Sequence, residues 1–183
     1  LLASTLSIGA LAHVAQSPSP SSAAAGQVTA PQEKDSVRFA VIGDTGTGTS
    51  SQYQIGERLT AARQMFPFEF VIMLGDNIYG SERPQDFVNK FEKPYKILLD
   101  AKVPFYAALG NHDDPTQRYY KPFNMNGERY YTYTKGSARF FVLDSNYMDQ
   151  AQLKWLETEL SRANERWKVA YFHHPLYSSG ERH

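Results

Sequence analysis

The sequence predicts an α/β fold, and two features of the chain carry that prediction. Short apolar runs alternate with segments of helical spacing, and each run stops at a polar residue. Nearly continuous apolar runs of this length are typical of buried strands that are covered on both faces. Helical segments between such strands form the right-handed crossovers that join parallel neighbours.

The expected elements follow from these runs in chain order. The predicted buried strands are residues 37–42, 70–74, 103–109 and 167–172. The predicted helices are residues 51–64, 86–99 and 149–163. Pro94 should break the second helix, and Asp149 is placed to cap the third. Two further strand-like segments, 129–134 and 138–143, flank a turn at 135–137 and predict a hairpin.

The first residues of the chain are apolar and carry no charge. We expect residues 1–15 to be the remnant of a signal peptide, with a membrane anchor or a buried helix as the alternative. Residues 16–35 are rich in Ser, Pro, Ala, Gly and Gln and predict a disordered linker. The folded domain is then expected over residues 36–183. These features predict a secreted or periplasmic protein with no stable membrane insertion after signal cleavage.

The composition excludes several classes of function. Lys plus Arg and Asp plus Glu each number 19, so no broad positive field is available for nucleic acid. The chain has no cysteine, which excludes disulfides and thiolate metal sites. Any metal must therefore be held by oxygen and nitrogen ligands.

Polar residues stand where the four predicted buried strands end: Asp44, Asp76, Asn111 and His173. Ligands of open α/β sheets bind beyond the carboxyl ends of the strands, so these side chains converge if the four strands are neighbours. This donor set suits Fe, Mn or Zn. Carboxylates at close range need cations between them, and a pair of metals could activate water for phosphoryl transfer.

Four short segments occur in order at these strand ends. They are Asp44-Thr45-Gly46, Gly75-Asp76-Asn77-Ile78-Tyr79, Gly110-Asn111-His112-Asp113 and His173-His174-Pro175. Together they resemble the first four of five sequence blocks of the calcineurin-like metallophosphoesterases, and Tyr79 points to the purple acid phosphatase branch. The resemblance covers about residues 38–183. It implies a metallophosphoesterase-type β-sandwich flanked by helices, an αββα fold, incomplete at the C-terminus.

The resemblance also implies a ligand for each of two metals. Asp44 and Tyr79, the latter as a phenolate, would bind the first metal, and Asp76 would bridge both. Asn111 and His173 would bind the second. The expected pair is Fe with Fe, Zn or Mn, and a ferric ion on the phenolate would give a violet colour.

The remaining expected roles concern the substrate, a small phosphorylated molecule. His112 would reach the phosphate as general acid or electrostatic stabiliser, and Asp113 would orient His112. His183 would touch the substrate. The implied reaction is in-line attack of metal-bound hydroxide on a phosphate ester, as in an acid phosphatase.

The fifth block of the family, Gly-His-x-His, does not occur in this sequence. It would supply one further histidine to each metal. We therefore expect the chain to be part of a longer protein, and as written to bind metal poorly and to be weakly active or inactive.

Three other functions stay open at this point. The same scaffold could hydrolyse a phosphodiester, a nucleotide or a phospholipid headgroup, since specificity lies in loops. It could also be a non-catalytic binding relic, although the expected ligands are intact. A dinucleotide-dependent oxidoreductase is disfavoured, because the segment 43–48 lacks the Gly-x-Gly-x-x-Gly spacing and Ser51 occupies the third place.

Overall fold

Two three-stranded sheets form the framework of residues 33–179, the part of the chain that the computed structural model describes. The first sheet has the order β1-β2-β3 and is parallel throughout: β1 (Phe39–Ile42), β2 (Phe70–Met73) and β3 (Phe105–Ala107). The second has the order β4-β5-β6: β4 (Tyr131–Lys135), β5 (Ala138–Val142) and β6 (Trp167–Tyr171). In it, β5 runs antiparallel to β4 and parallel to β6.

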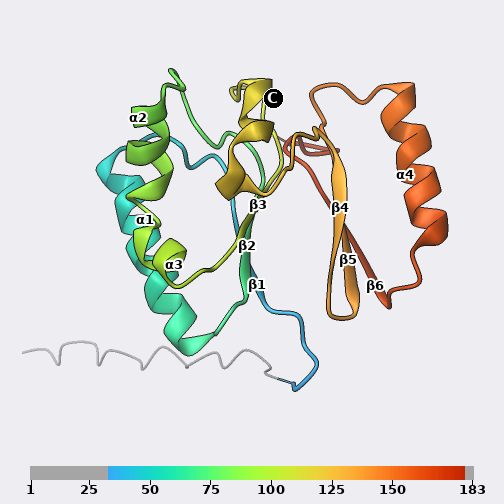
Figure 1. The fold of residues 1–183 in the computed structure, drawn as a ribbon, viewed down its shortest axis with the longest axis horizontal. Helices are drawn as coiled ribbons and strands as arrows, with labels where there is room; N and C mark the ends of the chain where they lie inside the picture. Colours follow the sequence, from blue (N-terminus) through green and yellow to red (C-terminus); the bar gives the residue numbers. More distant parts are fainter. Residues whose placement is uncertain (1–32, 180–183) are drawn as a thin grey trace, which may run out of the picture. The chain divides into compact units, whose positions relative to one another are not determined.

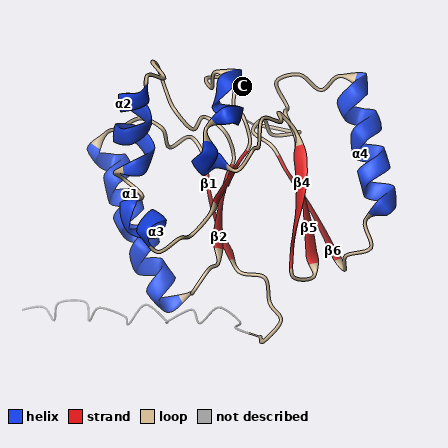
Figure 2. Ribbon diagram, viewed as in Figure 1, coloured by secondary structure: helices blue, strands red, loops and turns tan. Residues whose placement is uncertain are grey.

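Helices cover the outer faces of both sheets (Figure 1). On the side of β1–β3 lie α1 (Ser50–Met65), α2 (Pro84–Phe87), a π-helical turn η1 (Val88–Glu92) and α3 (Lys96–Asp100). On the side of β4–β6 lies α4 (Gln150–Arg162). Two short 3-10 helices, η2 (Pro115–Tyr119) and η3 (Lys121–Phe123), follow β3. The αββα arrangement predicted by the family resemblance is confirmed, as Figure 2 also shows.

Several local predictions are confirmed as well. The predicted second helix is interrupted around Pro94 and resumes at Lys96, because proline lacks the amide hydrogen that a helix needs. Asp149 caps α4, where its carboxylate accepts a hydrogen bond of 2.8 Å from the backbone N–H of Gln152. The hairpin β4–β5 turns through Gly136, whose φ of 52° lies in the left-handed region that glycine adopts readily.

The prediction that each of the four apolar strands is covered on both faces is wrong for two of them. All residues of the central strand β2 are buried, as expected. Val41 on β1 is 49% exposed, and Trp167 on β6 is 58% exposed. Within the described residues, β1 and β6 are edge strands, each paired on one side. An apolar run alone does not distinguish an edge strand from a central strand.

The four apolar strands are also not all neighbours in one sheet. β6 pairs with β5, with Ala138 opposite Trp167, and belongs to the second sheet. Convergence of the strand ends therefore depends on how the two sheets face each other.

Aromatic rings fill the space between the sheets. Phe70 on β2 packs against Phe140 on β5 at 5.4 Å between ring centroids, and Tyr106 on β3 stacks on Tyr133 on β4 at 4.0 Å. Two phenols add hydrogen bonds across the same gap. Tyr131 donates to the carbonyl oxygen of Ala107 at 2.8 Å, and the hydroxyl of Tyr171 donates to the carbonyl oxygen of Tyr106 at 3.2 Å. These contacts fix the second sheet against the first.

The expected signal peptide, and all but the last residues of the expected linker, lie outside the described part of the chain. Among residues 33–179, none of the helices combines the length and the apolar character that a bilayer crossing requires.

Replacing Phe140 by alanine tests the packing between the sheets. Its ring is fully buried, so its loss should lower the free energy of unfolding by about 3–5 kcal/mol. Tyr177→Ala is the control, because Tyr177 is 94% exposed and its removal should change stability by less than about 0.5 kcal/mol. Urea unfolding measures both. Equal effects of the two substitutions would contradict the described packing.

Candidate metal centre

Two carboxylates stand directly beyond the ends of adjacent strands. Asp44 follows β1 and Asp76 follows β2, and both adopt left-handed backbone angles, with φ of 55° and 52°. This conformation costs a non-glycine residue about 1 kcal/mol. Asp76 is only 3% exposed, whereas Asp44 is exposed. Tight turns at both strand ends thus direct two acidic groups to one edge of the first sheet.

His173 reaches the same edge from the second sheet. Its Nδ1 lies 3.0 Å from the carbonyl oxygen of Leu74. Because a carbonyl oxygen only accepts, Nδ1 carries a proton, and Nε2 is the ring nitrogen that can bind a metal ion. That nitrogen lies 3.0 Å from Oδ1 of Asn111 and 3.5 Å from Oδ1 of Asp76. Three potential ligand atoms therefore lie close together.

This arrangement fits a cation. Ligand atoms of Asp44, Asp76 and His173 all lie within 4.8 Å of one another. Lone pairs at such distances repel unless a proton or a metal ion lies between them. The carbonyl contact that orients His173 is also the kind of outer contact that fixes a metal-binding imidazole.

Tyr79 lies against the two carboxylates of the cluster. Its hydroxyl donates to Oδ2 of Asp76 at 2.7 Å and lies 3.3 Å from Oδ1 of Asp44. Burial, followed by the two neighbouring carboxylates, raises the pKa of Tyr79 well above its usual value. The proton of this phenol thus partly offsets the negative charge in the position that a cation could occupy.

Two glycines allow the loops to approach so closely. A Cβ on Gly110 would lie 2.2 Å from Oδ1 of Asp76. A Cβ on Gly75, whose φ is 98°, would lie 2.7 Å from Nδ1 of His173. Any side chain at these positions would displace a candidate ligand, which gives a steric reason for the glycines that precede Asp76 and Asn111.

His112 lies beside the cluster. Its backbone N–H donates to Oδ1 of Asp76 at 3.1 Å, and its exposed ring packs on the ring of Tyr79 at 5.1 Å between centroids. An open cavity of about 690 Å³ is lined by Asp44, Asn111 and His173, together with His174 and Pro175. The cluster is therefore accessible to a small molecule.

Comparison with known proteins now decides the family. The sequence profile of the calcineurin-like phosphoesterases matches residues 37–183. The chain belongs to that family. It is 26% identical to human acid phosphatase type 7, over 79% of this chain and 36% of that protein. It is 27% identical to the probable purple acid phosphatase 20 of Arabidopsis thaliana, over 84% of this chain and 39% of that one.

A solved structure shares the fold of this calcineurin-like phosphoesterase chain. It is a dimetal phosphatase from Danio rerio, with a TM-score of 0.60 and 15% identity over 76% of this chain and 70% of that one. The resemblance to the metallophosphoesterase fold and to purple acid phosphatases is thereby confirmed. The chain spans less than two fifths of the length of the two acid phosphatases named above.

Asp113 of this family member has contacts that the sequence did not indicate. We expected it to orient His112, but its carboxylate instead accepts hydrogen bonds from the backbone N–H groups of Asn77 (2.7 Å), Ile78 (3.1 Å) and Gly110 (2.8 Å). Burial raises its pKa, and these hydrogen bonds oppose that shift. Asp113 therefore joins the loop that carries Asp76 to the loop that carries Asn111.

Lys90 and Gln52 hold the candidate ligand loops from the helical side, and the sequence analysis missed both. Lys90, on the π-helical turn, donates to the carbonyl oxygens of Tyr79 at 2.7 Å and Ser81 at 3.1 Å. Gln52 is 4% exposed; it accepts from the N–H of Gly48 at 2.7 Å and donates to the carbonyl oxygen of Lys90 at 2.5 Å. Neither residue has a sequence signal of its own, because each acts through backbone groups brought near by the fold.

The structure thus brings together Asp44, Asp76, Tyr79, Asn111, His112 and His173. His183 lies outside the described residues.

Gly110→Ala tests the close approach of the two loops. The added methyl group should push Oδ1 of Asp76 aside and weaken Mn²⁺ binding by roughly tenfold or more, as calorimetric titration would measure. Gly127→Ala is the control, because a Cβ at this position would meet the ring of Tyr119, 3.2 Å away, rather than a candidate ligand. Unchanged Mn²⁺ affinity in Gly110→Ala would show that the described geometry is wrong.

Proposed function

We propose that this chain supplies the metal-holding part of a two-metal hydrolase of phosphate esters. The observation that carries the proposal is the group of potential ligand atoms formed by Asp76, Asn111 and His173, with Asp44 and Tyr79 beside it. Carboxylate, amide and imidazole groups this close together can share cations, which would offset the repulsion between the carboxylates.

The contacts suggest how two cations would be shared. Asp44, Asp76 and Tyr79 would hold the first, and Asp76, Asn111 and His173 the second. Iron paired with iron, zinc or manganese suits these oxygen and nitrogen donors. When bound, the pair supplies positive charge to the phosphoryl oxygens and activates water for in-line attack.

His112 would act on the leaving group. Its backbone is fixed on Asp76 while its ring stays exposed at the rim, so the imidazole can reach the ester oxygen of a bound phosphate and donate a proton to it. Asp113 would act as a positioning residue, because it binds the backbone on both sides of the centre. His183 would contact the substrate.

We propose a small phosphate monoester as the substrate. The cavity at the cluster is open, which also leaves room for a phosphodiester such as a nucleotide or phospholipid headgroup. A comparison of p-nitrophenyl phosphate with bis-(p-nitrophenyl) phosphate separates these two classes. Export from the cell, to the outside or to a periplasm, is the proposed location, and the apolar, uncharged first residues support it.

Asp76→Asn tests the two-metal hydrolase. The full-length wild-type protein should hold two metal ions per chain, as elemental analysis would show, and should hydrolyse p-nitrophenyl phosphate. The substitution removes the shared charge and should lower kcat by about 100-fold or more with loss of metal. Asp100→Asn is the control, since Asp100 is exposed and pairs with Lys96 on its own helix. A metal-free wild-type protein without activity would favour the binding relic instead.

His112→Gln tests the proton donor. Loss of the proton should lower kcat by about 100-fold for an alkyl phosphate, whose leaving oxygen is strongly basic. For p-nitrophenyl phosphate the loss should be less than about tenfold, because nitrophenolate leaves without a proton. Steady-state kinetics with both substrates measures the difference. Equal losses would rule out proton donation by His112.

A further inference from the structure

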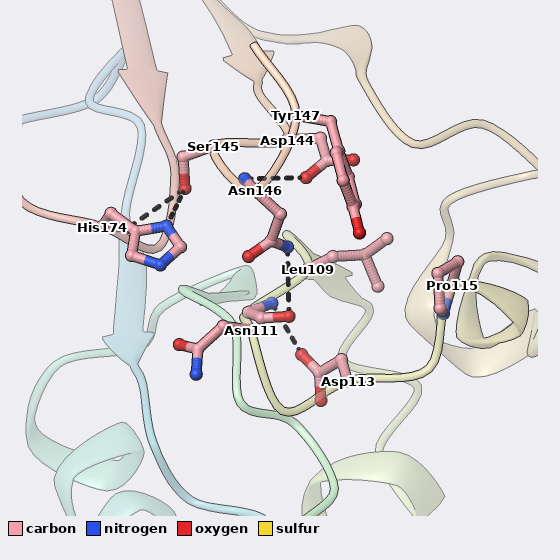
Figure 3. Close-up of a pocket in the computed structure, with 10 residues that line it drawn as sticks. Leu109, Asn111, Asp113, Pro115, Asp144, Ser145, Asn146, Tyr147 and His174 are labelled. Carbon is pink, nitrogen blue, oxygen red and sulfur yellow. Dashed lines mark hydrogen bonds between the residues drawn. The ribbon is translucent and has the colours of Figure 1, made fainter.

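A second cavity, of about 450 Å³, adjoins the candidate metal centre (Figure 3). We call it the Tyr147 pocket; it lies between the loop after β3, the loop after β5, and His174. Asn111 and His174 line both this pocket and the cavity at the metal cluster. A molecule whose phosphate sits at the cluster can therefore extend directly into the Tyr147 pocket.

Polar and apolar side chains both line the pocket. Figure 3 shows His174 and Asn111 toward one side and Tyr147 toward the other, with Asp144 beside Tyr147. The ring of Tyr147 is 64% exposed, so a ligand in the pocket can contact it. The ring of Tyr147, with Leu109 and Pro115 in the same lining, therefore offers a surface for a ring.

The residues that line the pocket disfavour a second anionic group on the ligand. Its described lining residues include no lysine or arginine. The two acidic lining residues are committed elsewhere: Asp144, 1% exposed, pairs with Arg129 at 2.8 Å, and Asp113 accepts from backbone N–H groups. Arg129 also pairs with Asp149, so its charge is offset as well. The pocket is suited to an uncharged group.

Hydrogen bonds hold the walls of the pocket in place. The Oγ atom of Ser145 lies 2.8 Å from Nδ1 of His174 and accepts from the backbone N–H of the same histidine at 3.1 Å. The side-chain amide of Asn146 donates to the carbonyl oxygen of Gly110 at 3.1 Å. These bonds join the ends of β3, β5 and β6, so a ligand would enter a pocket that is already formed.

We propose that the Tyr147 pocket binds the organic part of the phosphate ester, and that this part is an uncharged aromatic ring. The inference rests on the proposed function, because it needs the phosphate to sit at the metal cluster. It makes Tyr147 a specificity-determining residue: the ring of the substrate stacks on the ring of Tyr147 while the phosphate stays beside Asn111.

Two stable phosphonates test this proposal by calorimetric titration of the metal-loaded, full-length protein. Phenylphosphonate and methylphosphonate carry the same anionic group and differ in the ring. Phenylphosphonate should bind the wild-type protein more tightly, and Tyr147→Ala should weaken its binding by about fivefold, the value of one aromatic contact. Binding of methylphosphonate should change by less than about twofold, because a methyl group does not reach Tyr147.

Tyr119→Ala is the matched control. Tyr119 is 63% exposed and has Arg118 against its ring, as Tyr147 has Arg129 at 5.8 Å, but it lies outside the pocket. It should leave both affinities unchanged. If Tyr147→Ala alters neither phosphonate, or both alike, the pocket proposal is overturned while the proposed function stands. If neither phosphonate binds the wild-type protein, the proposed function itself fails.

Discussion

Repulsion among acceptor atoms is the constraint on which this structure depends. Asp44, Asp76 and His173 present ligand atoms within 4.8 Å of one another, and Asn111 adds an amide oxygen to the same group. The folded chain must hold the two carboxylates together against their mutual repulsion, and the phenol proton of Tyr79 lies between them. Bound metal ions would remove this repulsion and stabilise the folded chain, because each ligand atom would then face a positive charge.

The packing of the two sheets makes that convergence possible. Asp44 and Asp76 come from the first sheet, whereas His173 follows β6 in the second. Stacked aromatic rings and the phenols of Tyr131 and Tyr171 fix the distance between the sheets. The centre thus relies on a core that lies away from it, and the loops around it are held by hydrogen bonds of Asp113, Lys90 and Gln52.

The sequence predicted the strand ends well and the relation between the sheets poorly. Apolar runs that stop at Asp44, Asp76 and His173 are local signals, so the element order and the candidate ligands could be read directly. The apolar content of a strand does not determine its neighbours in the sheet. The place of β6 at the edge of a second sheet could therefore not be derived from its residues. Lys90 and the pocket at Tyr147 depend on contacts between distant segments, which leave no pattern in the chain.

One measurement tests the account most directly: anomalous diffraction from crystals of the full-length protein grown with Mn²⁺. The account predicts two peaks about 3.5–4 Å apart, with the carboxylate of Asp76 between them and Asn111 and His173 beside one of them. A single peak, or peaks remote from Asp76, would show that the acceptors from the two sheets do not enclose a pair of cations.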